Sequence, residues 1–235
     1  MTDNHRRLSI TRIKAVVADI DGTLTDMQRH ISTDAIAAIR SLPIPVVLSS
    51  GNVICFMRAA SKLIGASEAM IGETGGVIQV GYDSKPVILA DIEQCRQAAT
   101  VLQQHFPGME QLDARYRLSE LAFRRTVDVD KAREILDKAF PELEIIDTRF
   151  ALHLKHKSVN KGTGLVEVSR MMGLKPDEFA AMGDSANDIH MFNAAGMGLA
   201  VGNATPEIRE AADYVAQKPY GEGAAEALNW LARRL

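Results

Sequence analysis

Short apolar runs of strand length alternate with helical stretches in the first third, and again in the last third, of this 235-residue chain. Such alternation predicts a parallel β-sheet flanked by helices. In the first third the elements lie at residues 13–18, 33–41, 45–48, 53–64, 70–71 and 77–80. In the last third they lie at residues 164–172, 179–182, 188–195, 198–201, 206–212, 214–216 and 223–235. We therefore expect an α/β fold with a Rossmann-like parallel sheet as its core.

The region between these two parts, residues 81–157, has a different pattern. Its helical stretches lie at residues 91–106 and 129–140, and its short alternating runs at residues 121–127, 143–147 and 150–155. This mixture is typical of an α+β unit, and roughly 75 residues are enough for a domain. We expect residues 1–80 and 158–235 to form the core and residues 81–157 to form an inserted cap domain. Ligands of open parallel sheets bind beyond the carboxyl ends of the strands, where such a cap could act as a lid.

The composition of the chain argues against several classes of partner. A formal charge of −3 gives no basic footprint for nucleic acid or for an anionic membrane surface. The first twelve residues lack the apolar core of a signal peptide, and no apolar run is long enough to span a bilayer. Cys55 and Cys95 show no metal-type spacing and are expected to be free thiols. We expect a cytoplasmic monomer or homodimer that binds a small molecule.

Two acidic residues follow the first predicted strand, in Asp19-Ile20-Asp21-Gly22-Thr23. Because side chains alternate along a strand, Asp19 and Asp21 should emerge on one face at its carboxyl end, where Gly22 turns the backbone away. Two carboxylates this close repel each other unless a cation lies between them, so the pair indicates metal binding or divided acid/base roles. The alternative is a polar strand exit with an Asp turn.

Polar residues also follow the second strand, in Ser49-Ser50-Gly51-Asn52. A helix comes next, so a hydroxyl and free backbone N–H groups could point at an anion there. The same residues are also ordinary for a loop or a helix cap, and that reading stays open.

A third strand ends in another acidic run, which contains Asp184, Asn187 and Asp188. Oxygen ligands of this kind suit a hard divalent cation such as Mg²⁺, although Asp188 could simply cap the following helix. Lys161 lies at the start of a helix, where its charge opposes the helix dipole and is better placed opposite an anion. The alternative for Lys161 is a solvated surface lysine.

In their order and context, four motifs resemble those of the haloacid dehalogenase superfamily of phosphotransferases. They are Asp19-x-Asp21-Gly22-Thr23, Ser50-Gly51-Asn52, Lys161 at a helix start, and Gly183-Asp184-x-x-Asn187-Asp188. The insertion resembles the cap of the subgroup that contains the Cof-type sugar phosphatases and sucrose-phosphate phosphatase. Its short length and the Leu-Ser-Ser-Gly-Asn-Val variant are most similar to the archaeal-type phosphoglycolate phosphatases.

Two departures from the resemblance matter for the substrate. Many relatives have Thr-Gly-Arg where this chain has Ser50-Gly51-Asn52, and an Asn-Gly pair where Glu73-Thr74-Gly75-Gly76 stands. The missing Arg bears more on the larger sugar-phosphate substrates than on the phosphatase chemistry.

The resemblance implies a role for each motif. Asp19 would be the nucleophile that forms an aspartyl-phosphate, and Asp21 the general acid and base. Mg²⁺ would be held by the Asp19 carboxylate, the Asp21 backbone carbonyl and Asp184. Asn187 would act from a second shell around the metal, and Asp188 either from there or directly. The phosphoryl group would be bound by Gly22, Thr23, Ser50, Gly51, Asn52 and Lys161.

The function implied is Mg²⁺-dependent phosphomonoester hydrolysis, with 2-phosphoglycolate as the first candidate substrate. A sugar-phosphate phosphatase or phosphomutase on the same scaffold is the second reading, and a phospho-accepting regulator without turnover is the third. A substrate carboxylate would need a cationic partner in the cap. Arg124 or Arg125 is a candidate, at most one of them facing the site; both could instead be solvated. The six histidines form no ligand set, and His153 and His156 should face opposite ways.

Overall fold

The structure is a computed structural model that describes residues 12–148 and 150–235. An eight-stranded sheet and a four-stranded sheet organise this part of the chain. From edge to edge the large sheet contains β12 (Tyr214–Val215), β11 (Met197–Ala200), β10 (Phe179–Gly183), β1 (Ala15–Asp19), β2 (Val46–Ser49), β3 (Ala69–Gly72), β4 (Val77–Val80) and β5 (Val87–Ile88). The strands from β12 to β3 run parallel, whereas β4 and β5 are antiparallel to their neighbours.

The central strands of the large sheet are buried along their whole length. All five residues of β1 and all four of β2 are buried, as are those of β10 and β11. Parallel strands covered by helices on both faces carry continuous apolar runs, and this is the pattern that the sequence shows. The predicted α/β fold with a parallel sheet as its core is therefore confirmed, except that β4, which was expected to continue the parallel sheet, is antiparallel to β3.

The helices of this part follow from local signals in the sequence. They are α1 (Thr33–Ser41), α2 (Ile54–Ile64), α5 (Lys161–Met171), α6 (Ile189–Ala194), α7 (Pro206–Ala211) and α8 (Tyr220–Ala232), with short 3₁₀ turns η2 (Glu73–Gly75), η3 (Pro176–Glu178) and η4 (Ala186–Asp188). In α1, Ser32 caps the first turn by accepting from the Ala35 N–H, and Ala35, Ala38 and Ile39 form the buried stripe. No helix in the described ranges is long and apolar enough to cross a membrane.

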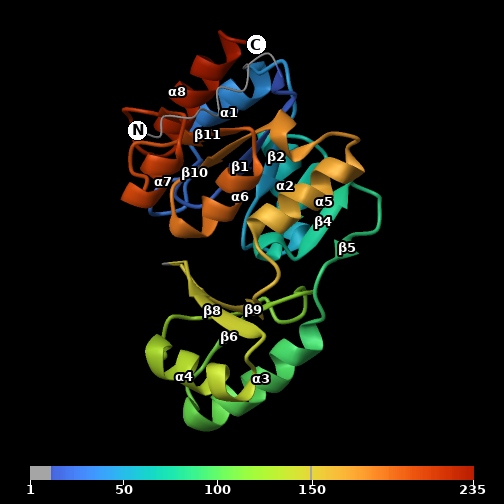
Figure 1. The fold of residues 1–235 in the computed structure, drawn as a ribbon, viewed down its shortest axis with the longest axis vertical. Coiled ribbons are helices and arrows are strands. Elements are labelled where there is room, and N and C mark those ends of the chain that lie inside the picture. Colours follow the sequence, from blue (N-terminus) through green and yellow to red (C-terminus); the bar gives the residue numbers. More distant parts are fainter. Residues whose placement is uncertain (1–11, 149) are drawn as a thin grey trace, which may run out of the picture.

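The small sheet is antiparallel and has its own core. Its strands, in order across the sheet, are β6 (Gln111–Leu112), β7 (Leu121–Phe123), β9 (Leu152–His156) and β8 (Leu143–Asp147). Helices α3 (Ile92–His105) and α4 (Val129–Ala139) pack against it around a separate apolar cluster that includes Leu102, Leu136 and Leu154. Figure 1 shows this sheet between its two helices and the large sheet. We call residues 91–156 the inserted segment.

The start of the inserted segment differs from the sequence-based boundary at residue 81. β5 pairs with β4, and the Leu89 N–H donates to the Gly76 carbonyl, so residues up to 89 stay with the large sheet. β5 and β6 each contain two residues, which is too short for a periodic signal to identify a strand.

Candidate active site

The order of the sheet brings distant segments to one edge. β1 lies between β10 and β2, and Asp19 pairs in register with Ser49. Asp184 directly follows β10, and Ser50 directly follows β2. Because neighbouring parallel strands end at the same edge, these polar residues gather where ligands of open α/β sheets bind.

Lys161 lies between two carboxylates at this edge. Its ammonium nitrogen is 2.5 Å from Asp19 Oδ1 and 2.5 Å from Asp188 Oδ1, and its side chain is fully buried. Burial alone would lower the pKa of Lys161, but the neighbouring Asp188 and Asp19 outweigh it and raise that pKa above its ordinary value. Lys161 is therefore a fixed positive charge beside Asp19.

Asp188 is engaged through both of its oxygens. Oδ1 contacts Lys161, and Oδ2 accepts from the backbone N–H groups of Asp184 and Ser185, each at 3.1 Å. Asp188 therefore orients Lys161 and fixes the loop after β10.

Thr23 and Gly22 shape the space between Asp19 and Asp184. The Thr23 hydroxyl lies 3.1 Å from Asp184 Oδ1 and 3.4 Å from Asp19 Oδ2. Gly22 has φ +89°, and a Cβ there would lie 2.8 Å from Asp184 Oδ2. A side chain at position 22 would therefore both strain the backbone and displace Asp184.

The acidic residues of the site fit a divalent cation. Asp19, Asp184 and Asp188 are buried, and each offers one oxygen within 4.8 Å of the others. Burial, with Asp188 and Asp184 nearby, raises the pKa of Asp19 well above its usual range even though Lys161 opposes the shift. One lysine thus leaves an excess of negative charge, which a cation with oxygen ligands would offset. Asp188 is held by Lys161 and by two backbone N–H groups, whereas Asp19 and Asp184 face each other across the Thr23 hydroxyl, so these two carboxylates are the better placed ligands.

Asp21 has a different environment from Asp19. Its Oδ1 accepts from Arg29 Nε at 2.8 Å, and its Oδ2 accepts from Asn52 Nδ2 at 3.0 Å. The Asp21 side chain is 18% exposed, whereas that of Asp19 is 6% exposed. Asp19 and Asp21 therefore differ both in their hydrogen-bond partners and in their exposure to solvent.

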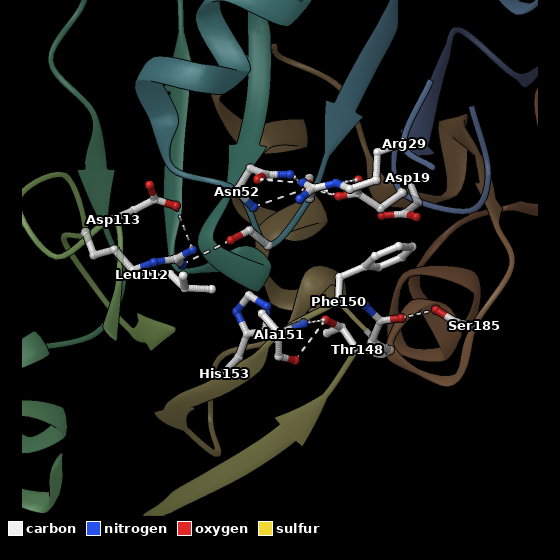
Figure 2. A pocket seen from close by; sticks show the side chains of 15 residues that line it. Asp19, Arg29, Asn52, Leu112, Asp113, Thr148, Phe150, Ala151, His153 and Ser185 are labelled. Carbon is white, nitrogen blue, oxygen red and sulfur yellow. Dashed lines mark hydrogen bonds and ion pairs between the residues drawn. The ribbon is translucent and has the colours of Figure 1, made fainter. Parts of the chain in front are cut away.

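A cavity of about 90 Å³ lies over Asp19 and Asp21, between the large sheet and the inserted segment (Figure 2). The inserted segment contributes Phe150, Ala151 and His153 to its wall, all from the β8–β9 hairpin. A substrate that reaches Asp19 is thus enclosed by both parts of the chain.

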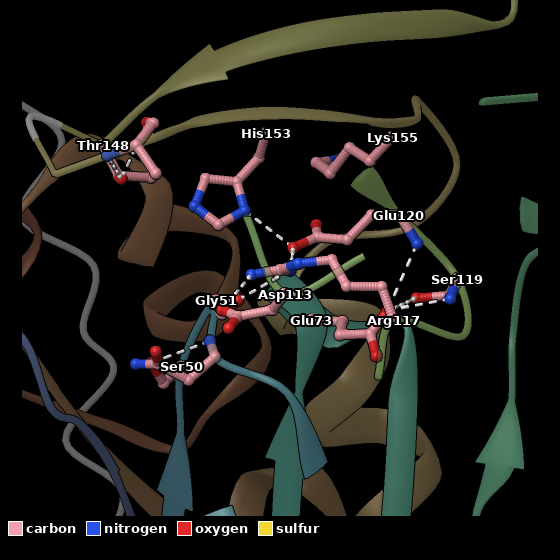
Figure 3. Close-up of polar contacts among 12 residues, drawn as sticks. Ser50, Gly51, Glu73, Asp113, Arg117, Ser119, Glu120, Thr148, His153 and Lys155 are labelled. Atoms are coloured by element: carbon pink, nitrogen blue, oxygen red, sulfur yellow. Dashed lines mark hydrogen bonds and ion pairs between the residues drawn. The ribbon is translucent and has the colours of Figure 1, made fainter. Parts of the chain in front are cut away.

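A buried polar network from the inserted segment meets the loop after β2 (Figure 3). Arg117 Nη1 donates to Glu120 Oε1 at 2.6 Å and to the Gly51 carbonyl at 3.0 Å, and His153 Nδ1 lies 2.7 Å from the same Glu120 oxygen. Burial would raise the pKa of Glu120, but His153 and Arg117 outweigh it and lower that pKa. Glu120 therefore acts as a buried anion that holds two cavity-lining side chains in place.

Glu73 of η2 joins the inserted segment to the large sheet. Its Oε2 accepts from the N–H groups of Ser119 and Glu120 at 2.8 and 3.2 Å, and Leu118 donates to the same carboxylate at 3.0 Å. The Glu73 N–H in turn donates to the Asn52 carbonyl at 3.0 Å. One buried residue thus couples the loop after β2 to the segment that covers the cavity.

The sequence-predicted residues fall into two groups. The first group lies at the sheet edge described above and consists of Asp19, Asp21, Gly22, Thr23, Ser50, Gly51, Asn52, Lys161, Asp184, Asn187 and Asp188. Ser185 donates a hydrogen bond to Asn187, and both line the cavity.

Arg124 and Arg125 lie elsewhere. Arg124 pairs with Glu110 at 2.7 Å and Arg125 with Asp147 at 2.8 Å. Neither is among the described residues that line the cavity. The cavity instead contains Arg29, Arg117 and His153. No sequence pattern pointed to the two arginines, and His153 was expected only to face away from His156, with no role in the site.

A family model and several known proteins match this chain along most of its length. The family model of haloacid dehalogenase-like hydrolases matches residues 16–110 and 111–228. A phosphoglycolate phosphatase of Methanosarcina mazei is 43% identical over 220 residues, which are 94% of this chain and 97% of that protein. One of Methanoculleus marisnigri is 46% identical over 92% of this chain and 95% of its own.

Solved structures agree on the fold. The crystal structure of Thermoplasma acidophilum 0175 superposes with a TM-score of 0.86 at 28% identity, covering 95% of this chain and 99% of that chain. A haloacid dehalogenase-like hydrolase from Bacteroides thetaiotaomicron gives a TM-score of 0.76 at 20% identity, covering 93% and 99% of the two chains, and bears on the fold alone. By its family match and by the identity of its relatives along nearly their whole length, this chain belongs to the haloacid dehalogenase-like hydrolase family.

Proposed function

We propose that this protein is a Mg²⁺-dependent phosphomonoester hydrolase with 2-phosphoglycolate as its substrate. The observation that carries the proposal is the buried Asp19, held by Lys161 at a strand end and facing a cavity that Asp21 also lines. The relatives named phosphoglycolate phosphatase support the choice of substrate.

Asp19 acts as the nucleophile. Its carboxylate oxygen attacks phosphorus, and the bond between phosphorus and the ester oxygen breaks, which leaves the phosphoryl group on Asp19. A carboxylate that approaches a phosphate dianion meets strong repulsion. Lys161, fixed by Asp188, offsets part of it.

Asp21 acts as general acid and then as general base. It gives a proton to the departing alkoxide, and later takes one from the water whose oxygen attacks phosphorus and releases Asp19. Asn52 Nδ2 and the Ser50 hydroxyl lie 3.0 and 3.5 Å from Asp21 Oδ2, so they position this carboxyl toward the cavity.

Mg²⁺ would be held by the carboxylates of Asp19 and Asp184 and by the Asp21 backbone carbonyl. When bound, it neutralises charge on the phosphoryl oxygens. Thr23 and Gly22 keep Asp184 in place for this role, and Asn187 and Asp188 support the same loop.

The size of the cavity favours a small substrate. The cavity over Asp19 has a volume of about 90 Å³, and a second one of about 170 Å³ shares Asp21 and Phe150 with it. Each is smaller than the roughly 300 Å³ at which sites for drug-sized ligands begin. The sugar-phosphate phosphatase or phosphomutase, which needs a larger substrate, is therefore the second candidate function. A regulator that keeps its phosphoryl group is poorly served by Asp21, because a neighbouring base hastens hydrolysis.

We also propose that the chain divides into a catalytic core and a cap. The two parts have separate apolar clusters, and the inserted segment forms the cap.

We propose the cytoplasm as the compartment of this protein. The free thiols of Cys55 and Cys95 suit a reducing environment of that kind.

Phosphate release from a panel of phosphomonoesters, with and without Mg²⁺, tests the proposal. We expect Mg²⁺-dependent release with kcat/KM for 2-phosphoglycolate above that for hexose phosphates. A preference for hexose phosphates, or a requirement for a hexose bisphosphate activator, would favour the second reading. A phosphorylated protein that releases no phosphate would favour the regulator.

A further inference from the structure

We propose that Arg29 binds the carboxylate of the substrate's leaving group and thereby selects phosphorylated acids. This inference rests on the proposed function, because it assigns a binding partner to the part of the substrate that departs. It concerns a residue of the large-sheet part of the chain, outside the four motifs and outside the inserted segment.

Arg29 lies on a tight turn between Thr25 and Ile31, which form an antiparallel bridge. Its N–H donates to the Asp26 carbonyl, and its φ is +66°, in the left-handed region that a non-glycine residue rarely adopts. Such a conformation costs on the order of 1 kcal/mol or more and is found most often where a side chain has a task. The turn presents the Arg29 side chain to the cavity.

The guanidinium of Arg29 lies one hydrogen bond from the group that must touch the ester oxygen. Its Nε is 2.8 Å from Asp21 Oδ1, and its Nη2 is 3.3 Å from Asn52 Oδ1. An ester oxygen in contact with Asp21 therefore places the atoms attached to it beside Arg29. In 2-phosphoglycolate the carboxylate is one carbon beyond that oxygen, within reach of a bidentate guanidinium contact.

Two arginines among the described residues line the cavity, and their surroundings differ. Arg117 is 3% exposed and forms a 2.6 Å ion pair with Glu120, whose side chain is 1% exposed. Moving Arg117 onto a substrate would leave the buried Glu120 carboxylate with His153 alone and would also break the hydrogen bond to the Gly51 carbonyl, which is costly.

Arg29 carries no such cost. Its side chain is 46% exposed, and its partner Asp21 keeps the hydrogen bond from Asn52 when Arg29 turns to a ligand. Arg29 can therefore exchange partners with little loss, whereas Arg117 serves to hold the cavity wall.

Phe150 of the inserted segment covers one side of the Arg29 guanidinium. The Phe150 ring centroid lies 5.6 Å from the Arg29 guanidinium carbon, and Figure 2 shows the two side chains on facing walls of the cavity. A carboxylate bound there is partly screened from water, which strengthens its interaction with the arginine.

The test compares two substrates that differ in this carboxylate. Wild type, Arg29→Gln and Arg29→Lys are assayed for kcat/KM with 2-phosphoglycolate and with ethyl phosphate, in saturating Mg²⁺. We expect wild type to prefer 2-phosphoglycolate and Arg29→Gln to lose about 10- to 100-fold of that preference, mainly through KM. Arg29→Lys should recover part of it, because it keeps the charge without the planar fork. Arg124→Gln, which removes a surface arginine paired with Glu110, is the matched control and should keep the preference.

The outcomes separate this inference from the proposed function. If Arg29→Gln lowers kcat/KM for both substrates by the same factor, Arg29 only positions Asp21 and the carboxylate site is refuted. If Arg29→Gln has the same kcat/KM as wild type for both substrates, the carboxylate site is refuted as well. If wild type hydrolyses both substrates equally well, phosphomonoester hydrolysis stands and the carboxylate site fails. If wild type hydrolyses neither, the proposed function itself fails.

Discussion

The ammonium nitrogen of Lys161 lies 2.5 Å from a carboxylate oxygen of Asp19, although 142 positions separate the two residues in the chain. Lys161 begins α5 and Asp19 ends β1, so the contact exists only when the helix after the inserted segment packs against the large sheet. The geometry of the proposed nucleophile therefore depends on the whole core.

Replacing Lys161 with Met should make stability depend on a divalent cation. The variant leaves Asp19 and Asp188 buried without their lysine and close to the buried Asp184, and loss of one partner of a buried ion pair costs about 3–5 kcal/mol. Urea denaturation at pH 7 should show this loss in the free energy of unfolding without Mg²⁺, and Mg²⁺ should restore more stability to the variant than it adds to wild type. Equal stability of the two proteins without Mg²⁺ would argue against an uncompensated acidic cluster.

Replacing Asp21 with Asn should affect poor leaving groups most. General acid catalysis contributes about 10²–10⁴-fold, so kcat for 2-phosphoglycolate should fall by that factor. For p-nitrophenyl phosphate, whose leaving group needs little protonation, the loss should be much smaller. Steady-state kinetics with both substrates measures the two losses, and equal losses would contradict the acid role of Asp21.

Replacing Glu120 with Gln should destabilise the protein in a pH-dependent way. The pKa of Glu120 is lowered in the folded state, so its charge contributes stability above the usual glutamate range, and that contribution is lost as the pH falls through the lowered pKa. We expect a difference in unfolding free energy of about 3 kcal/mol between wild type and variant at pH 7, which shrinks below about pH 4.5. A difference that does not change with pH would mean that Glu120 is not a buried anion.

The two thiols should react at very different rates. Cys55 is exposed, whereas Cys95 is buried in the inserted segment, and burial raises the pKa of its thiol to about 12. Ellman's reagent should titrate one thiol per native chain quickly and the second only on denaturation. A Cys55→Ser variant that still reacts quickly would show that the inserted segment opens readily.

The sequence predicted most of the elements of the large sheet for physical reasons. Residues 33–41 form α1 as expected, because the helical stripe and its cap are local signals. β1 and β10 were recognisable as buried apolar runs, and the convergence of Asp19 and Asp184 follows from the common edge of parallel strands.

Other features depend on contacts that no local pattern records. Arg29 and Arg117 reach the cavity through a turn and a loop, and His153 faces it because of how the inserted segment packs over the large sheet. The hydrogen bonds between Glu73 and residues 118–120 join segments about 45 positions apart. Composition and periodicity describe one element at a time, so they could not identify these partners.

The most direct measurement is made at Asp19 itself. The Asp21→Asn variant is mixed with p-nitrophenyl phosphate and Mg²⁺, because this leaving group needs little protonation and only hydrolysis of the intermediate is slowed. The mixture is quenched in acid and digested, and the peptides are weighed by mass spectrometry, while Asp19→Asn is assayed in parallel for phosphate release. We expect one added phosphoryl group on the peptide that contains Asp19, and no phosphate release by Asp19→Asn. Near-normal turnover by Asp19→Asn, or a phosphoryl group on another residue, would contradict the assignment of Asp19 as the nucleophile.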